Sequence, residues 1–401
     1  MKKSIFCDML LNIVASMIPI AVLQLWILPS LGKAIPEEEY GLAITIVAFF
    51  SVLPGASGNV LNNVRLIHAK EGERSNQTDF NVVLACLCCL NLLGVIGFSA
   101  LYDKEITLIG IALNIIASLL LLLHEYYIVA FRININYIYV VVSNVFLTFG
   151  YGLGYGLFKV CGYWQFIYIV GYLVSDIYIM SKCDLWKEPL KISTKFKRIS
   201  SDTGFLMTSG ILGGAVTYAD KLLIFPLLGG GTVAVYHAAT VFSKVISMAV
   251  SPISSVMLTY LSKIRKKENN VFLITLLTGT VVCIFGYALC IFLSKPVIGV
   301  LYPQYVEEAI KYIYITTGVA VLQALYSLIS PFVLRFFDSM WQLWFSGGTV
   351  VLYVVLCVSM LYKWGLRGLC IGVLLANAFK VAFLIIIYAK CKTRREISDN
   401  G

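Results

Sequence analysis

Long apolar runs follow one another along almost the whole chain, and each is as long as a membrane-crossing helix. About 20 apolar residues cross the ~30 Å hydrocarbon core of a bilayer when they form a helix. Twelve runs can be counted, at approximately 5–31, 40–64, 80–102, 106–130, 136–158, 163–181, 203–228, 232–261, 271–294, 310–334, 341–362 and 366–389. Because each run has helix length and lacks strand alternation, the sequence predicts an all-α integral membrane protein.

Composition supports the same class. The chain is 59% hydrophobic and 13% charged, whereas soluble domains average about 45–50% and about 25%. The net charge of +10 comes from lysines and arginines that are grouped by loop, so it does not indicate a nucleic-acid partner. The eleven cysteines are scattered, three of them within the apolar run 80–102. We interpret them as small buried apolar residues and expect no disulfide and no metal site.

Lysine and arginine are concentrated in one alternating set of loops, above all in 182–202 and 263–267. Positively charged residues mark the cytoplasmic loops of membrane proteins. We therefore expect both termini of the chain in the cytoplasm.

The two halves of the chain repeat one another. Seven positions in the first half recur 196 to 198 residues later: Pro29, Leu31, Gly32, Tyr40, Ala43, Pro54 and Arg65 correspond to Pro226, Leu228, Gly229, Tyr236, Ala239, Pro252 and Lys263. Six spans per half place both halves in the membrane with the same orientation. The sequence predicts two pseudo-symmetric six-helix lobes, 1–181 and 203–401, joined by a basic cytoplasmic linker, 182–202, with a short basic tail at the C-terminus.

Two regions resemble a known family. Leu28–Gly32 and Pro36–Gly41 resemble the first hairpin of polysaccharide-repeat and O-antigen (Wzx-type) flippases. Tyr218–Lys221, Leu228–Gly229 and Tyr236 resemble their seventh and eighth helices. These flippases belong to the multidrug, oligosaccharidyl-lipid and polysaccharide exporter superfamily. The resemblance implies a MATE-like, V-shaped transporter with two lobes.

The resemblance also implies a function. Such a protein moves an undecaprenyl-diphosphate-linked oligosaccharide, a repeat unit of O-antigen, capsule or exopolysaccharide, from the cytoplasmic to the outer face of a bacterial inner membrane. It implies contact with membrane lipid and, as protein partners, a polysaccharide polymerase and a chain-length regulator, without a cofactor. Some lipid-linked precursor flippases of this superfamily carry arginines in the first helix, and this sequence has none there. Their substrate-binding residues therefore cannot be transferred to that helix.

Four cationic residues are candidates for binding the diphosphate. Lys244 and Lys380 lie near the middle of their spans, where a lysine facing lipid costs about 2.5–3.5 kcal/mol. The alternative is that each pairs with a carboxylate to hold helices together. Lys221 lies closer to a helix end, so it can also extend to the headgroups. Arg65 ends a polar stretch of the second span, which suits either a cleft mouth or a helix contact.

Three carboxylates, Asp220, Glu125 and Asp176, are candidates for coupling transport to a proton or a cation. The alternative for Glu125 and Asp176 is a structural salt bridge to Arg65 or Arg132. Asp8 in the first span has the same two interpretations. For Asp220, beside Lys221, the alternative is structural pairing. His124 is interpreted as a hydrogen-bonded structural group.

Two other functions use the same features. A cation-coupled multidrug exporter on the same fold predicts a carboxylate-dominated site in the first lobe. A membrane-embedded polymerase or acyltransferase requires a sizeable outward loop with a catalytic arginine or histidine, and every outward loop is short. We therefore expect no catalytic residue and no enzymatic activity, and we favour the flippase.

Overall fold

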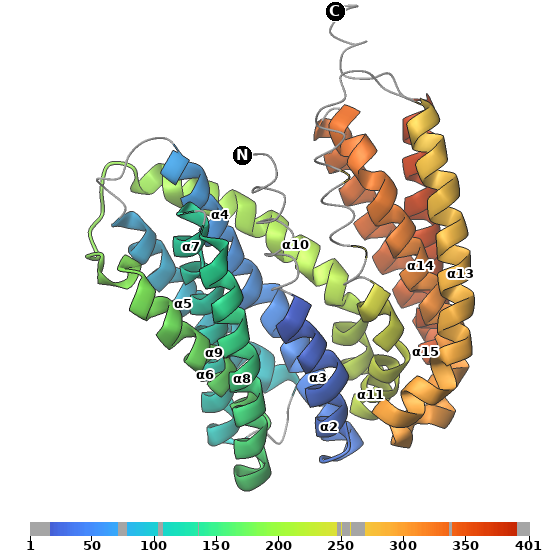
Figure 1. Cartoon of the computed structure of the whole chain (residues 1–401), viewed down its shortest axis with the longest axis horizontal. Coiled ribbons are helices and arrows are strands. Elements are labelled where there is room, and N and C mark those ends of the chain that lie inside the picture. The colour runs from blue at the N-terminus through green and yellow to red at the C-terminus, as the bar shows by residue number, and fades with distance from the viewer. Residues whose placement is uncertain are drawn as a thin grey trace, which may run out of the picture. The chain divides into compact units, whose positions relative to one another are not determined.

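The computed structural model describes residues 17–70, 78–102, 107–134, 136–246, 250, 257, 269–336 and 339–390 (Figure 1). In these ranges the backbone is helical or forms turns and short connections, without a strand. The chain divides into two compact units, unit 1 at Met1–Val233 and unit 2 at Ala234–Gly401.

The described helices and helical turns of unit 1 run from η1 to the start of α11. They are η1 (Leu23–Ile27), α2 (Leu28–Gly32), α3 (Glu37–Phe50), η2 (Ser51–Gly55), α4 (Ala56–Lys70), α5 (Asp79–Tyr102), α6 (Leu108–Tyr127), α7 (Val129–Ile133), α8 (Tyr137–Cys161), α9 (Gln165–Lys182), η3 (Leu185–Lys187), α10 (Phe196–Leu228) and α11 (Gly230–Ala239). Here η1 and η2 are π-helical turns and η3 is a 3₁₀ turn. Pro29 lies two residues after the end of η1 and Pro54 lies inside η2. A proline removes one helical hydrogen bond and can widen the local winding.

From residue 269 on, the described part of unit 2 consists of three long helices and a short turn. They are α13 (Asn269–Leu301), α14 (Val306–Phe336) and α15 (Ser339–Lys390), with a 3₁₀ turn η4 (Pro303–Tyr305) before α14. The backbone of α15 leaves helical geometry at Trp364 and Gly365, where Gly365 has a φ of 58°. This break divides α15 into two helices, as the predicted spans 341–362 and 366–389 require.

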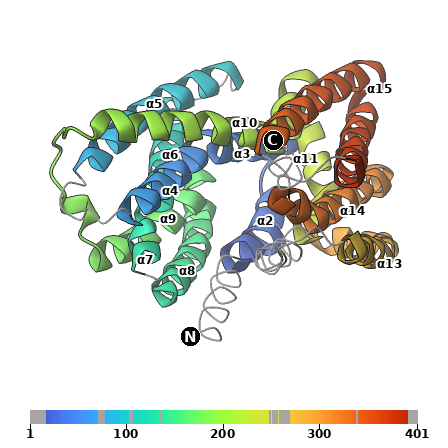
Figure 2. The same ribbon diagram turned by 90° about the horizontal axis from the view of Figure 1, so that it is seen from above.

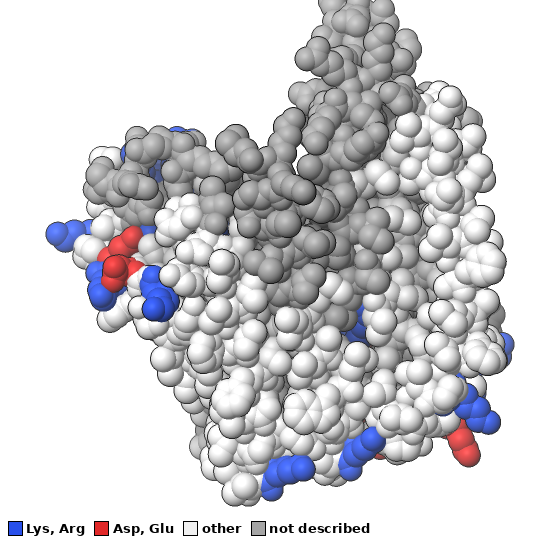
Figure 3. Space-filling model, in the orientation of Figure 1, with Lys and Arg blue, Asp and Glu red and all other residues white. Residues whose placement is uncertain are grey.

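The described helices follow the predicted spans. Eight of them are long and apolar enough to cross a membrane, and Met17–Gly32 is a shorter apolar helix. The predicted runs 5–31 and 232–261 lie partly outside the described residues. The all-α, multi-pass membrane class is therefore confirmed. On the face of unit 1 drawn in Figure 3, charged side chains gather toward two opposite ends and the surface between them is largely uncharged.

Close helix packing in unit 1 depends on glycine. A Cβ atom on Gly154 of α8 would lie 2.4 Å from the carbonyl oxygen of Phe166, and one on Gly150 would lie 2.8 Å from the Cα of Gly171. Small residues four apart let α8 and α9 approach backbone to backbone. The cysteine interpretation is only partly right, because Cys86 and Cys89 lie exposed on α5 whereas Cys283, Cys357 and Cys370 are buried.

Helix α10 packs within unit 1. It crosses α3, η2, α4 and α5 (Figure 1 and Figure 2). Gly210 faces Val60 and Gly214 faces Val52, so the two glycines let α10 lie close to α4 and η2. The repeat assigns α10 to the second half of the chain, while its contacts assign it to unit 1. The sequence boundaries 181 and 203 remain a prediction about the repeat.

Candidate functional site

A cation in unit 2 lies on an aromatic ring. The Nζ atom of Lys380, in the second part of α15, is 4.1 Å from the ring centroid of Tyr326 on α14. Both side chains are half-buried, and Gln323 is exposed one turn from Tyr326. Ser327 is also half-buried and donates its hydroxyl to the Gln323 carbonyl at 2.9 Å. Since a lysine in hydrocarbon is costly, this polar patch is suited to water or a polar ligand rather than to lipid tails.

A second cation of unit 2 contacts a histidine. The Nζ atom of Lys244 lies 3.0 Å from Nδ1 and 3.1 Å from Nε2 of His237. His237 is 2% exposed and packs edge-on against Tyr302. A lysine ammonium can only donate, and which nitrogen of His237 accepts depends on the tautomer of the ring. Sequence reasoning missed His237, although its spacing of seven residues from Lys244 places both on one helix face.

The two lysines lie at different levels of α14. Ser243, next to Lys244, donates its hydroxyl to the carbonyl of Thr316 at 3.2 Å. Lys380 contacts Tyr326, ten positions further along the same helix. Ten residues of α-helix correspond to about 15 Å. The structure therefore does not bring Lys244 and Lys380 together as a single clamp.

Asp220 and Lys221 lie on α10. The Nζ atom of Lys221 is 5.3 Å from the ring centroid of Tyr218, and Asp220 accepts a hydrogen bond from the Lys221 backbone N–H at 2.9 Å. Asp220 shares a helix face with Ser209, Gly213 and Thr217, because their spacings of four, four and three residues follow the helical repeat. Ser209, Gly213 and Thr217 are exposed and Asp220 is half-buried, so α10 carries an accessible polar stripe.

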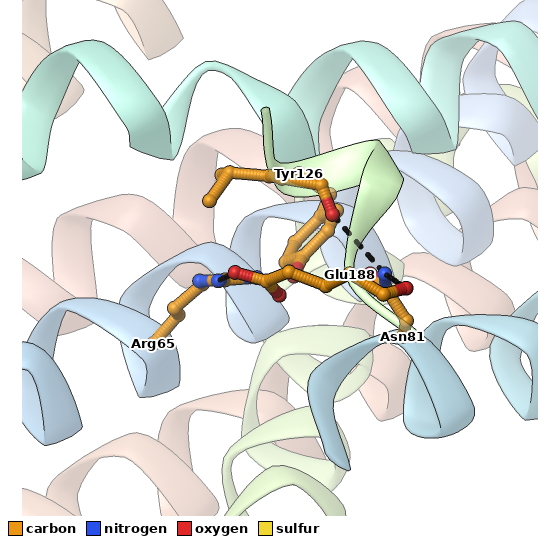
Figure 4. A network of polar contacts seen from close by, with 5 residues as sticks. Arg65, Asn81, Tyr126 and Glu188 are labelled. Carbon is orange, nitrogen blue, oxygen red and sulfur yellow. Dashed lines mark hydrogen bonds and ion pairs between the residues drawn. The ribbon is translucent and has the colours of Figure 1, made fainter. Parts of the chain in front are cut away.

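Arg65 has a different setting from the other three cations. It is fully buried in unit 1, where Nη1 donates to the hydroxyl of Tyr126 and Nη2 lies 2.5 Å from Oε1 of Glu188. Figure 4 shows Glu188 between Arg65 and Asn81. The Asn81 amide donates to the carbonyls of Glu188 at 2.9 Å and Leu185 at 3.1 Å. These contacts occupy the guanidinium, so in this structure Arg65 connects α4 to the segment after α9.

The carboxylates of unit 1 find partners that the sequence did not indicate. Oδ1 of Asp176 on α9 lies 2.9 Å from Nδ1 of His124 on α6, and both residues are buried. Within the described residues Oδ2 of Asp176 has no hydrogen-bond partner. Arg132 donates to the side-chain oxygens of Asn62 at 2.8 Å and Asn63 at 3.4 Å, and Asn62 donates to the backbone carbonyl of Glu125.

His124 is thus a hydrogen-bonded group, as its interpretation from the sequence requires. The pair with Asp176 can also hold a proton, because Oδ2 of Asp176 has no hydrogen-bond partner among the described residues. Asp8 lies outside the described residues.

Glu38, in the first turn of α3, caps the N-terminus of α11. Its Oε2 accepts a hydrogen bond from the backbone N–H of Gly230 at 2.6 Å. A Cβ atom on Gly230 would lie 2.4 Å from the carbonyl oxygen of Glu38, and one on Gly41 would lie 1.9 Å from that of Gly230. The two repeat-related hairpins therefore meet backbone to backbone, with a carboxylate at the positive end of a helix. Sequence reasoning missed this contact, although the runs Glu37–Glu39 and Gly229–Gly231 are its visible signals.

The chain was compared with known proteins. No protein-family model and no curated protein sequence matches it. Among solved structures, lipid II flippase MurJ in an inward closed conformation matches with a TM-score of 0.69 at 13% identity, over 97% of this chain and 87% of that one.

Two multidrug-type structures match as well. An inward-facing multidrug resistance MATE family transporter of the MOP superfamily matches with a TM-score of 0.64 at 12% identity, over 94% of this chain and 98% of that one. The eukaryotic MATE transporter AtDTX14 matches with a TM-score of 0.62 at 14% identity, over 95% of both chains. At such low identities these similarities establish the fold. The predicted MATE-like class is therefore confirmed: the chain has the helical membrane fold that MATE transporters share with the flippase MurJ.

Proposed function

We propose that the chain is a non-enzymatic flippase that moves an undecaprenyl-diphosphate-linked oligosaccharide across a bacterial inner membrane. The substrate is a repeat unit of O-antigen, capsule or exopolysaccharide. The protein works by alternating access, and both of its termini lie in the cytoplasm. The observation that carries this proposal is the accessible cationic patch around Lys380 in a unit built from membrane-crossing helices.

The patch matches the chemistry of a diphosphate-linked sugar. The diphosphate is anionic and is stabilised by an ammonium group in a setting of reduced dielectric constant. Gln323 offers an amide that can exchange hydrogen bonds with sugar hydroxyls, and Tyr326 offers an aromatic ring. Because Lys244 and Lys380 are about 15 Å apart along α14, the diphosphate contacts them in succession rather than at once.

Further residues in unit 1 have proposed roles. Lys221 and Asp220 on the polar stripe of α10 line the path, with Lys221 contributing to the diphosphate contacts. Arg65 acts on the substrate only in a state in which Glu188 has left it, since Glu188 occupies it here.

Replacement of Lys380 tests the proposal. Lys380→Gln removes the charge and keeps most of the side chain, and we expect at least a tenfold loss of glycolipid translocation in proteoliposomes. Lys380→Arg should retain more activity because it keeps the charge. Lys311→Gln is the matched control, since Lys311 is exposed beside Glu308 at the start of α14. Normal translocation by Lys380→Gln would overturn the proposed role.

A cation-coupled multidrug exporter is the second candidate, and the His124–Asp176 pair favours it. A buried carboxylate with one free oxygen in unit 1 can bind the coupling proton or cation, and Glu125 and Asp220 are further candidates. An exporter should move a small cationic dye out of the cell in exchange for protons that flow in, and Asp176→Asn should abolish this dye transport. A flippase should move the glycolipid and show no dye transport.

The proposed function places the chain beside other proteins of polysaccharide synthesis. A polysaccharide polymerase uses the glycolipid after it reaches the outer face, and a chain-length regulator acts with the polymerase. Deletion of the gene should therefore leave undecaprenyl-diphosphate oligosaccharide on the cytoplasmic face, which radiolabelled sugar and membrane extraction can measure. A deletion strain with normal surface polysaccharide would contradict this placement.

A further inference from the structure

The segment that connects α9 to α10 has an inward side fixed to unit 1. Cys183, Leu185 and Phe196 pack against the apolar core between α4, α5, α6 and α10. Burial raises the pKa of the Cys183 thiol. Asp79 at the start of α5 accepts hydrogen bonds from the backbone N–H of Ser193, at 2.7 Å, and from its hydroxyl.

The middle of the segment is held as well. Asn81 donates to the carbonyls of Leu185 and Glu188, and Glu188 pairs with Arg65. The segment therefore cannot turn over without breaking bonds to buried groups, which is costly.

The outward side of the segment combines apolar and basic side chains. Trp186 is 48% exposed, and Leu190 and Ile192 are each 69% exposed. Lys187 and Lys191 are exposed between them. We call these five residues the headgroup strip.

The two acidic residues of the segment do not cancel this charge. The carboxylate of Glu188 points inward to Arg65. Asp184 contacts Lys187 at 2.7 Å in a pair that is largely exposed and therefore weak. Lys191, Lys197 and Arg198 follow as exposed basic residues without an acidic residue between 189 and 201.

The position of the strip determines what it contacts. It begins four residues after the end of α9 and ends four residues before α10. Because α10 has the length and composition of a membrane span, and α9 packs along α8, which is another, the strip lies at the face of the membrane that the protein crosses. Tryptophan and aliphatic side chains beside lysines are suited to the interface between acyl chains and headgroups.

We propose that the headgroup strip is a docking site for acidic phospholipids of this membrane. Lys187 and Lys191 contact the headgroup phosphates, while Trp186, Leu190 and Ile192 enter the interface between headgroups and acyl chains. A free phosphate ion would use the lysines and leave three apolar side chains in water. The anchored backbone keeps the strip oriented before lipid binds, so little conformational entropy is lost on docking. This inference does not depend on which substrate the protein moves.

Lipid-dependent quenching of Trp186 tests the proposal in the full-length protein. The protein is reconstituted in nanodiscs that contain spin-labelled phosphatidylglycerol or spin-labelled phosphatidylcholine, with the label near the headgroup. The difference between the wild type and Trp186→Phe isolates the signal of Trp186 from that of the other tryptophans. We expect stronger quenching by phosphatidylglycerol than by phosphatidylcholine, decreasing as the salt concentration rises.

Removal of the lysines should abolish the preference. In Lys187→Gln/Lys191→Gln we expect the ratio of association constants, phosphatidylglycerol over phosphatidylcholine, to fall by up to about fivefold per lysine. The matched control is Lys33→Gln/Lys159→Gln, which removes two exposed lysines elsewhere on unit 1 and should leave the ratio unchanged. Thermal unfolding of all variants checks that they fold.

Three results would overturn the proposal. Quenching of Trp186 by aqueous iodide but by neither lipid would show that the strip faces water, where a soluble protein could bind it. Equal quenching by both lipids, unaffected by lysine removal, would show interfacial anchoring without selection of acidic lipid. Loss of the preference upon addition of millimolar inorganic phosphate at constant ionic strength would identify a site for the free anion.

Discussion

Ionisable side chains are used differently in the two units. In unit 1 the buried charges are paired across helices, as in Arg65–Glu188 and His124–Asp176. In unit 2 the described contacts of Lys380 and Lys244 include the rings of Tyr326 and His237, and both lysines remain partly accessible. A charge that is neutralised by its partner holds helices together, whereas a cation on a neutral ring retains its attraction for an anion. We therefore expect the unit 1 pairs to stabilise the fold and the unit 2 lysines to bind an anion.

The largest effect should come from breaking the buried pair of unit 1. Glu188→Ala leaves the Arg65 guanidinium buried without its carboxylate partner, beside the Tyr126 hydroxyl and the ring of Phe80. We expect the variant to lose about 3 kcal/mol of free energy of unfolding. The double variant Arg65→Met/Glu188→Ala should recover most of the loss, because no charge is left buried. Thermal unfolding in detergent measures both, and equal losses in the single and double variants would contradict the pairing.

The second pair of unit 1 should show a smaller loss. Asp176→Asn keeps the size of the side chain and one acceptor for His124 but removes the negative charge. We expect a loss of about 1–3 kcal/mol from a buried hydrogen bond to a charged group. The same thermal unfolding assay applies. An unchanged unfolding midpoint together with a shifted pH dependence of transport would show that the His124–Asp176 pair serves transport rather than stability.

In unit 2 a change of aromatic partner should alter transport and leave stability nearly intact. His237→Phe keeps a ring beside Tyr302 and removes the nitrogen that accepts from Lys244. We expect transport to change several-fold, because the ammonium loses its orienting hydrogen bond, and the unfolding midpoint to move little. Glycolipid translocation and thermal unfolding are measured on the same sample. A large loss of stability with normal transport would show that unit 2 also uses its cation for packing.

The smallest effect concerns the anchored segment after α9. The raised pKa of Cys183 lowers the fraction of reactive thiolate at neutral pH, so maleimide labelling of a variant that keeps only this cysteine should be slow. Its rate should rise with pH, because the thiolate fraction grows as pH approaches the raised pKa. Asp79→Asn weakens the contact with Ser193 and should speed labelling by a few-fold. Equal rates in both variants would indicate that Asp79 does not hold the segment.

Much of the fold could be predicted because it depends on local composition. The runs 80–102 and 136–158 became α5 and α8 with boundaries within a few residues. The turn at Gly365 was visible as a short break between two apolar runs. In the repeat, Gly229 is the counterpart of Gly32. The structure adds that the two hairpins touch at Gly41 and Gly230.

The candidate site was less predictable. The sequence marked Lys380 as a cation at membrane depth, and the structure supplied Tyr326 as its neighbour. Arg65 carries the same charge in the sequence, and its polar stretch suits either a cleft mouth or a helix contact; the structure buries it against Glu188. The sequence does not indicate Glu188 as its partner.

The sequence by itself determined that this protein is a bundle of membrane-crossing helices, because burial of apolar side chains in lipid is additive along each helix. Only the tertiary structure decided which charges are paired. The partner of Arg65 lies 123 residues away and that of His124 lies 52 residues away. A pair forms only when packing brings the two groups within hydrogen-bond distance, and such distances are properties of the assembled helices.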